Sequence, residues 1–213
     1  MSAVLRLDAT EDPEAVVDAV VEVLLDGGVV VLPTDTVYGL AALPGDEAAM
    51  ARLFALKGRD ASTPIAVLCA DLRQASALVE PGSTAALRPV GERWWPGPLT
   101  LVLPRRPGAA LHLGEPAGTV GLRVPDHALV RAVAARTGPV AATSANRHRQ
   151  PTAVTIEEAV LAFDGGLDAV VDAGALEGRA STVIDATSSP WRVLRDGPLP
   201  ADEIVQASQP RLL

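Results

Sequence analysis

The pattern of apolar and polar positions along the chain predicts alternating helices and strands. Apolar residues recur at helical spacing in 9–28, where Thr10 is expected to cap the helix and Pro13 suits its first turn. Similar patterns predict helices in 46–59, 71–79, 83–95, 126–138, 155–163 and 201–208. Short apolar runs predict strands in 29–33, 64–70, 96–106, 119–125, 139–146, 168–174, 181–187 and 191–197.

The order of these elements indicates an α/β fold with a mixed sheet. Strands alternate with helices in the first three quarters of the chain and cluster afterwards, which disfavours a purely parallel sheet. The run 29–33 is apolar throughout, so we expect this strand to be covered on both faces. No linker divides the sequence, and residues 1–213 are expected to form a single domain.

The composition narrows the range of partners and compartments. Of the 213 residues, 48% are hydrophobic, and the formal net charge is −8, which disfavours a protein that coats nucleic acid. The single cysteine, Cys69, lies in the apolar stretch 64–70, which favours a buried thiol and a reducing compartment. The sequence shows no signal peptide and no apolar run of the ~18 residues that a membrane helix needs. We therefore expect a cytoplasmic protein without a membrane partner.

Polar side chains gather where the predicted strands and helices end. The candidates are Thr34, Asp35, Thr36, Lys57, Arg59, Arg123, Ser144, Asn146 and Arg195. In open α/β sheets, ligands bind beyond the ends of strands, where loops supply the specific groups. Several cations and hydroxyls at such ends suit an anionic small molecule, and phosphate is the obvious anionic group.

Each candidate also has a plain structural interpretation. Lys57 and Arg59 could be solvated cations at the negative end of a helix dipole. Ser144 and Asn146 could form a turn, and the two threonines could cap the segment that follows them. Arg123 is different, because a guanidinium between apolar residues must find acceptors or open onto a cavity.

Several common site patterns are absent from the sequence. There is no GxxxxGK[ST] phosphate loop, no GxGxxG after a strand and no GxSxG elbow. The histidines are dispersed, at His112, His127 and His148, without a nearby cysteine or pair of acids. A zinc site is therefore not expected.

Seven short stretches, taken together, resemble one protein family. They are "PTDTVYGLAA", "KGRDASTPIAVL", "WPGPLTLVL", "VGLRVPDH", "PVAATSAN", "STVIDAT" and "VLRDG", in this order. Over nearly its entire length the chain is similar to the short form of the YrdC/TsaC family of L-threonylcarbamoyladenylate synthases. The resemblance implies a YrdC-like fold, in which a twisted mixed sheet flanked by helices surrounds a large open cavity.

The resemblance also implies an activity. The family members are nucleotidyltransferases that convert L-threonine, bicarbonate and ATP into L-threonylcarbamoyl-AMP and pyrophosphate. A downstream transferase complex moves the threonylcarbamoyl group to an adenosine of tRNA. Mg²⁺ would accompany ATP and share its phosphate charge, and no metal site built from protein groups alone is expected.

Roles for single residues follow from the same resemblance. The catalytic signature would be Lys57, Arg59, Ser144 and Asn146. ATP would be bound by these four together with Thr63, Thr119, Gln150 and Arg195. L-Threonine would be bound by Thr36, Arg123, Ala142 and Ser181, while Tyr38 would pack beneath this wall.

The sequence departs from the family pattern at two places. Some relatives have a histidine that touches threonine where this chain has Leu68. After Asn146, the stretch "RHRQPTA" replaces a small Ser-Gly turn, which bears on the expected contact of Gln150 with ATP.

Three other functions stay open at the level of sequence. One is a paralogue of the same fold without adenylate synthesis, and another is a carbamoyl-phosphate enzyme in which this fold is one domain of a longer chain. The third is an RNA-binding module that contacts tRNA or double-stranded RNA, which the net charge of −8 disfavours as the principal role.

Overall fold

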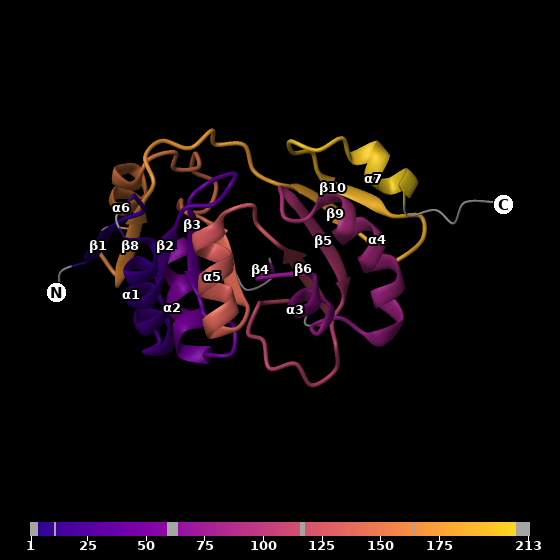
Figure 1. The fold of residues 1–213 in the computed structure, drawn as a ribbon, viewed down its shortest axis with the longest axis horizontal. Helices are drawn as coiled ribbons and strands as arrows, with labels where there is room; N and C mark the ends of the chain where they lie inside the picture. The colour runs from indigo at the N-terminus through magenta and orange to yellow at the C-terminus, as the bar shows by residue number, and fades with distance from the viewer. Residues whose placement is uncertain (1–3, 11, 59–63, 116–117, 164, 208–213) are drawn as a thin grey trace.

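The computed structural model describes residues 4–10, 12–58, 64–115, 118–163 and 165–207. The chain forms a mixed α/β structure around one ten-stranded sheet (Figure 1). The strands are β1 (Leu5–Asp8), β2 (Val30–Leu32), β3 (Gly39–Ala42), β4 (Ala66–Leu68), β5 (Leu99–Pro104), β6 (Thr119–Arg123), β7 (Val140–Ser144), β8 (Ala169–Asp172), β9 (Thr182–Asp185) and β10 (Arg192–Arg195). The helices are α1 (Pro13–Leu25), α2 (Glu47–Lys57), α3 (Leu72–Ser76), α4 (Thr84–Trp94), α5 (Ala128–Thr137), α6 (Ile156–Phe163) and α7 (Ala201–Ala207), with a 3₁₀ turn at Pro81–Ser83.

The sheet has the order β1-β8-β2-β3-β7-β4-β6-β5-β9-β10. The neighbours β1–β8, β8–β2, β4–β6 and β5–β9 are parallel. The neighbours β2–β3, β3–β7, β7–β4, β6–β5 and β9–β10 are antiparallel. The predicted mixed sheet is therefore confirmed, and β1 and β3 are strands that the sequence pattern did not predict.

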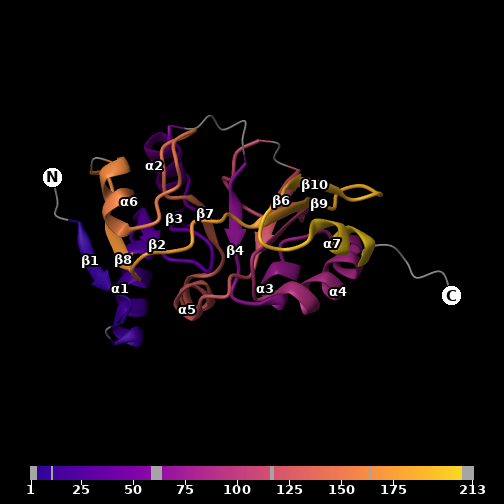
Figure 2. The same ribbon diagram turned by 90° about the horizontal axis from the view of Figure 1, so that it is seen from above.

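Helices cover both faces of the sheet at β2, as the apolar run predicted. Val30 and Leu32 pack in one cluster with α1 and α5, whereas Val31 packs in the other cluster with α2. Figure 2 shows α1 and α5 on one side of the strands and α2 and α6 on the other. None of the helices in the described ranges has the length and apolar character that a membrane crossing requires.

The helix ends fix the position of Asp12 at the start of α1 and of Lys57 at the end of α2. α1 is capped by Asp12, whose carboxylate accepts from the Glu14 amide at 3.0 Å. The predicted cap, Thr10, instead donates to Asp8, because Pro13 takes the first helical position and leaves the cap to the residue before it. α2 ends at Lys57 as predicted, since Gly58 follows with a left-handed φ of 61°.

Cys69 is expected to be chemically inert in the folded protein. Its side chain is fully buried, and burial, with the nearby Asp71 charge, raises the pKa of its thiol to about 12. A thiol reagent such as DTNB should therefore label the native protein negligibly at pH 8 and label it fully in denaturant. Rapid labelling of the native protein would contradict the buried position, and a Cys69→Ala variant serves as the blank.

Candidate active site

A cavity of about 490 Å³ lies against the sheet between β3 and β10. Alternation along the strands supplies its lining, because successive side chains point to opposite faces. In β6, Thr119, Gly121 and Arg123 line the cavity, whereas Leu122 packs in the core; Val120 also packs in the core and borders the cavity. The charged residues that line it, within the described part of the chain, are both arginines: Arg123 and Arg195. This face is therefore suited to an anionic ligand.

Small side chains keep the floor of the cavity open. Ala66 and Ala142 are register partners on β4 and β7, and both line it. A Cβ added at Gly121 would lie 3.6 Å from Ala66 Cβ and 3.5 Å from Thr100 Cγ2, which is ordinary contact. The absence of a side chain at this position therefore leaves space for a ligand rather than relieving a clash.

Two protein segments, at 35–36 and at Gly97, fix the guanidinium of Arg123, which is 6% exposed. Nε donates to Gly97 O at 3.1 Å, Nη1 to Thr36 Oγ1 at 2.8 Å and Nη2 to Asp35 Oδ1 at 2.6 Å. Burial lowers the pKa of Arg123, and the Asp35 charge opposes that shift. Three of the five N–H groups are engaged within the described residues, so two stay available to a ligand.

The hydroxyl of Thr36 is set as an acceptor toward the cavity. Thr34 Oγ1 lies 2.7 Å from Val37 O, and since a carbonyl carries no proton, Thr34 must donate there. The 2.9 Å contact between the two threonine hydroxyls then takes its proton from Thr36. Because Thr36 also accepts from Arg123, one lone pair is left for a donor on a ligand.

Arg195 and Ser181 form the wall opposite Thr36. Arg195 donates from Nε to Ser181 O and from Nη2 to Ser181 Oγ, both at 2.9 Å. Ser181 Oγ is also 2.9 Å from Thr100 Oγ1. Partial burial lowers the pKa of Arg195, and the Arg123 charge lowers it further, so the two guanidiniums repel each other.

Lys57 connects α2 to the loop after β7. Its Nζ donates to Ser144 O at 2.6 Å and to Asn146 Oδ1 at 2.7 Å, and its side chain is buried. Ser144 Oγ donates to the same Asn146 oxygen at 2.6 Å. Since Ser144 lines the cavity, this cluster places an ammonium directly behind the cavity wall.

Most of the predicted site residues lie together. Of the predicted site residues, seven line the cavity: Thr36, Thr119, Arg123, Ala142, Ser144, Ser181 and Arg195. Lys57 and Asn146 join them through Ser144. Leu68, at the position where some relatives have histidine, also lines the cavity.

Three predicted residues are not placed in this cavity. Arg59 and Thr63 lie outside the described residues. Gln150 is exposed and borders a separate hollow of about 510 Å³ next to α6, and its backbone carbonyl accepts from Asn146 Nδ2.

Thr100 was not predicted from the sequence, and Asp35 was indicated only as one of the polar residues at the end of a strand, without a partner. The hydroxyl of Thr100 faces the cavity from an otherwise apolar strand, and this interruption of the pattern "LTLVL" is the signal that could have indicated it. Asp35 pairs with Arg123 across the fold, which no local pattern indicates.

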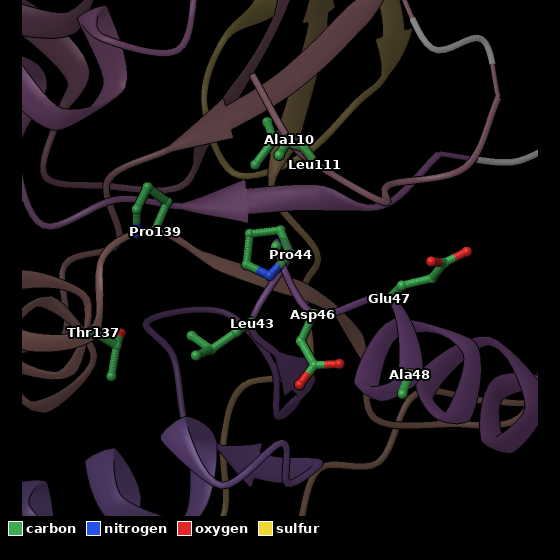
Figure 3. A pocket seen from close by; sticks show the side chains of 10 residues that line it. Leu43, Pro44, Asp46, Glu47, Ala48, Ala110, Leu111, Thr137 and Pro139 are labelled. Carbon is green, nitrogen blue, oxygen red and sulfur yellow. The ribbon is translucent and has the colours of Figure 1, made fainter. Parts of the chain in front are cut away.

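Another hollow, of about 690 Å³, lies at the far end of β3 (Figure 3). Its charged lining residues are Asp46 and Glu47, beside apolar groups such as Leu43 and Leu111. This lining disfavours phosphate. Within the described residues, no cluster of three or more His, Cys, Asp or Glu side chains is placed to hold a metal ion.

His127, at the start of α5, is expected to make the folded protein less stable in acid. Burial is the main cause that lowers the pKa of His127; Arg131 also lowers it, while Asp35 and Asp126 oppose the shift. The unfolded chain then binds the proton more tightly, so stability is lost as the pH falls below about 6.5. As the pH is lowered from 7.5 to 5, the melting temperature of wild type should fall more than that of His127→Gln, so the difference between variant and wild type should increase. The exposed His148→Gln serves as the control, and identical pH profiles for wild type and His127→Gln would contradict the prediction.

Comparison with known proteins agrees with the fold and with the ordered sequence stretches. The family model for Sua5, YciO and YrdC proteins, described as "Telomere recombination", matches residues 22–197. A Mycobacterium leprae protein is 37% identical over 187 residues, which cover 87% of this chain and 84% of that protein. A Bacillus subtilis protein named threonylcarbamoyl-AMP synthase is 36% identical over 200 residues, which cover 92% of this chain and 57% of that protein.

A solved structure gives the same result in three dimensions. The crystal structure of Pyrococcus abyssi Sua5 complexed with L-threonine superposes with a TM-score of 0.85 at 32% sequence identity. The similarity covers 97% of this chain but 61% of the archaeal one, so this chain spans about three fifths of that protein. Sequence and fold therefore agree, and this chain belongs to the Sua5/YciO/YrdC family.

Proposed function

We propose that this protein synthesises L-threonylcarbamoyl-AMP and pyrophosphate from L-threonine, bicarbonate and ATP. The observation that carries the proposal is that one cavity joins the Arg123–Thr36 group to the Lys57–Ser144–Asn146 cluster. The first group suits an amino acid and the second suits phosphate. We call them the threonine end and the phosphate end.

At the threonine end, the two remaining N–H groups of Arg123 would bind the carboxylate of L-threonine. The free lone pair of Thr36 would accept a hydrogen bond from the substrate hydroxyl or ammonium group. Ser181 Oγ and the backbone at Ala142 line the same space. The proposal agrees with the Pyrococcus abyssi relative, whose structure contains L-threonine.

At the phosphate end, Lys57 would supply positive charge, and Ser144 and Asn146 would hold Lys57 in place. Arg195, which is bonded to Ser181, would supply a second positive charge to ATP from the threonine side of the cavity. Thr119 also lines the cavity, and on β6 it is about level with Ser144. Arg59, Thr63 and Gln150 remain predictions based on family resemblance. The described residues that line the cavity include no carboxylate, so Mg²⁺ would arrive with ATP and be held by phosphate oxygens.

The chemistry requires two anions to react. The amine of threonine captures carbon dioxide or bicarbonate as a carbamate, and a carbamate oxygen attacks the α-phosphate of ATP while pyrophosphate leaves. This displacement needs no protein nucleophile. It needs positioning and charge stabilisation, which the two ends of the cavity are built to provide.

The decisive experiment is an assay of pyrophosphate release from ATP. We expect release only when L-threonine and bicarbonate are both present. Equal rates with serine, glycine and threonine, or release without bicarbonate, would disprove the function. The assay also separates this function from that of a paralogue without adenylate synthesis and from that of a carbamoyl-phosphate enzyme.

Transfer of the product to tRNA by a partner complex, and the single-domain organisation of residues 1–213, belong to the same proposal.

An RNA-binding module is the second candidate, and the acidic net charge of −8 counts against it. A salt titration of tRNA binding tests it, because a steep decrease in affinity with salt would favour the RNA module.

A further inference from the structure

Asp35 lies behind the guanidinium of Arg123. Its neighbours Thr34 and Thr36 line the cavity, whereas Asp35 does not. The Asp35 and Arg123 side chains are 14% and 7% exposed, and their contact is 2.6 Å long. Among the salt bridges of the described residues, this is the only one with both side chains below 15% exposure. The carboxylate therefore holds Arg123 without lining the cavity, and it can act on a ligand only through its charge.

The two arginines of the cavity differ in how their charge is balanced. Arg123 has a carboxylate partner, Asp35, which balances its charge. Arg195 is bound by the carbonyl and hydroxyl oxygens of Ser181, which are neutral, and it forms no salt bridge within the described part of the chain. The cavity thus has one arginine whose charge is balanced by a carboxylate and one whose charge is not.

This difference matches the charges of the two substrates. Free L-threonine is a zwitterion with no net charge, whereas a phosphate chain is strongly anionic. An Arg123 without Asp35 would attract any anion, including the pyrophosphate that the reaction releases. With Asp35 in place, the ammonium group of threonine is attracted by the carboxylate, and an anion without an ammonium group is repelled by it.

We propose that Asp35 is a specificity-determining residue that makes the threonine end select zwitterionic amino acids over simple anions. This inference rests on the proposed function. Its sign follows from Coulomb's law, because removing one negative charge beside Arg123 strengthens the binding of an anion relative to that of a zwitterion. Any loss of Arg123 orientation affects both ligands, since both use the same N–H groups.

The test compares two ligands that differ by one ammonium group. They are L-threonine and (R)-3-hydroxybutyrate, which has the same carboxylate and hydroxyl. Dissociation constants are measured by calorimetry for wild type and for Asp35→Asn, whose amide oxygen can still accept from Arg123. We expect the preference of wild type for threonine to fall by about 10-fold in Asp35→Asn. Asp168→Asn, which changes the exposed Arg52–Asp168 pair in the same way, should keep the wild-type preference.

The possible outcomes distinguish a failure of the role proposed for Asp35 from a failure of the proposed function. A wild type that binds (R)-3-hydroxybutyrate as well as threonine would overturn the role of Asp35 without any variant. An unchanged preference in folded Asp35→Asn would overturn it as well, and leave the proposed function standing. A wild type that binds neither ligand would instead overturn the threonine end itself, and with it the proposed function.

Discussion

Replacing Arg123 by alanine is expected to weaken the use of L-threonine by roughly 2–4 kcal/mol, with a much smaller effect on ATP. The guanidinium is nearly dry, at 6% exposure, and is held by Gly97, Thr36 and Asp35, so its two free N–H groups are fixed before substrate binds. The measurement is the KM for each substrate in the pyrophosphate assay.

The design must separate binding from folding, because Arg123→Ala leaves the Asp35 carboxylate buried without its cation. The double variant Arg123→Ala with Asp35→Asn removes that orphaned charge, and should recover thermal stability without recovering threonine use. Arg123→Lys keeps the positive charge but loses the planar pair of N–H donors, so its use of threonine should remain impaired. An equal loss for both substrates in all three variants would reject the role of Arg123.

Replacing Lys57 by methionine is expected to lower kcat/KM for ATP by about 100-fold. Methionine keeps the volume of the buried stem but removes the ammonium, which binds Ser144 O and Asn146 Oδ1. Two effects then combine: the phosphate end loses a positive charge, and the Ser144–Asn146 loop loses the group that holds it. The KM for threonine should change far less.

A cation on the same helix provides the control for Lys57. Arg52 lies on α2 and pairs with Asp168 at the surface, at 2.8 Å, away from the cavity. Arg52→Ala should leave both substrates unaffected. If Lys57→Met behaves like Arg52→Ala, then Lys57 only ends a helix and takes no part in ATP use.

The sequence predicted the elements whose own residues carry a strong pattern. β2 and β8 are continuous apolar runs, and α1 has a complete apolar stripe, so these were recognised. β3 was missed because "GLAA" has weak strand propensity, and it is a strand only because β2 and β7 pair with it on both sides. β1 is short and mostly exposed, and its pairing with β8 spans most of the chain.

A site residue could be predicted from the sequence where its own side chain has a clear physical requirement. Arg123 in an apolar strand required acceptors or a cavity, and the structure supplies both. The partner of Arg123 was not predictable, since Asp35 is 88 residues away and looks like a turn former. Gln150 stays a prediction: its backbone carbonyl accepts from Asn146, and it borders the hollow next to α6 rather than the cavity.

The backbone hydrogen bonds that join β6, β4 and β7 fix the distance between the backbone positions of Arg123 and Ser144. Arg123 is level with Leu68, and Leu68 with Val140, so two strand spacings of about 4.8 Å separate Arg123 from β7. Ser144 lies four residues further along β7, or about 13 Å. The separation of the backbone positions that carry Arg123 and Ser144 is thereby set by strand pairing, and side chains adjust the distance between their binding groups only within their own length.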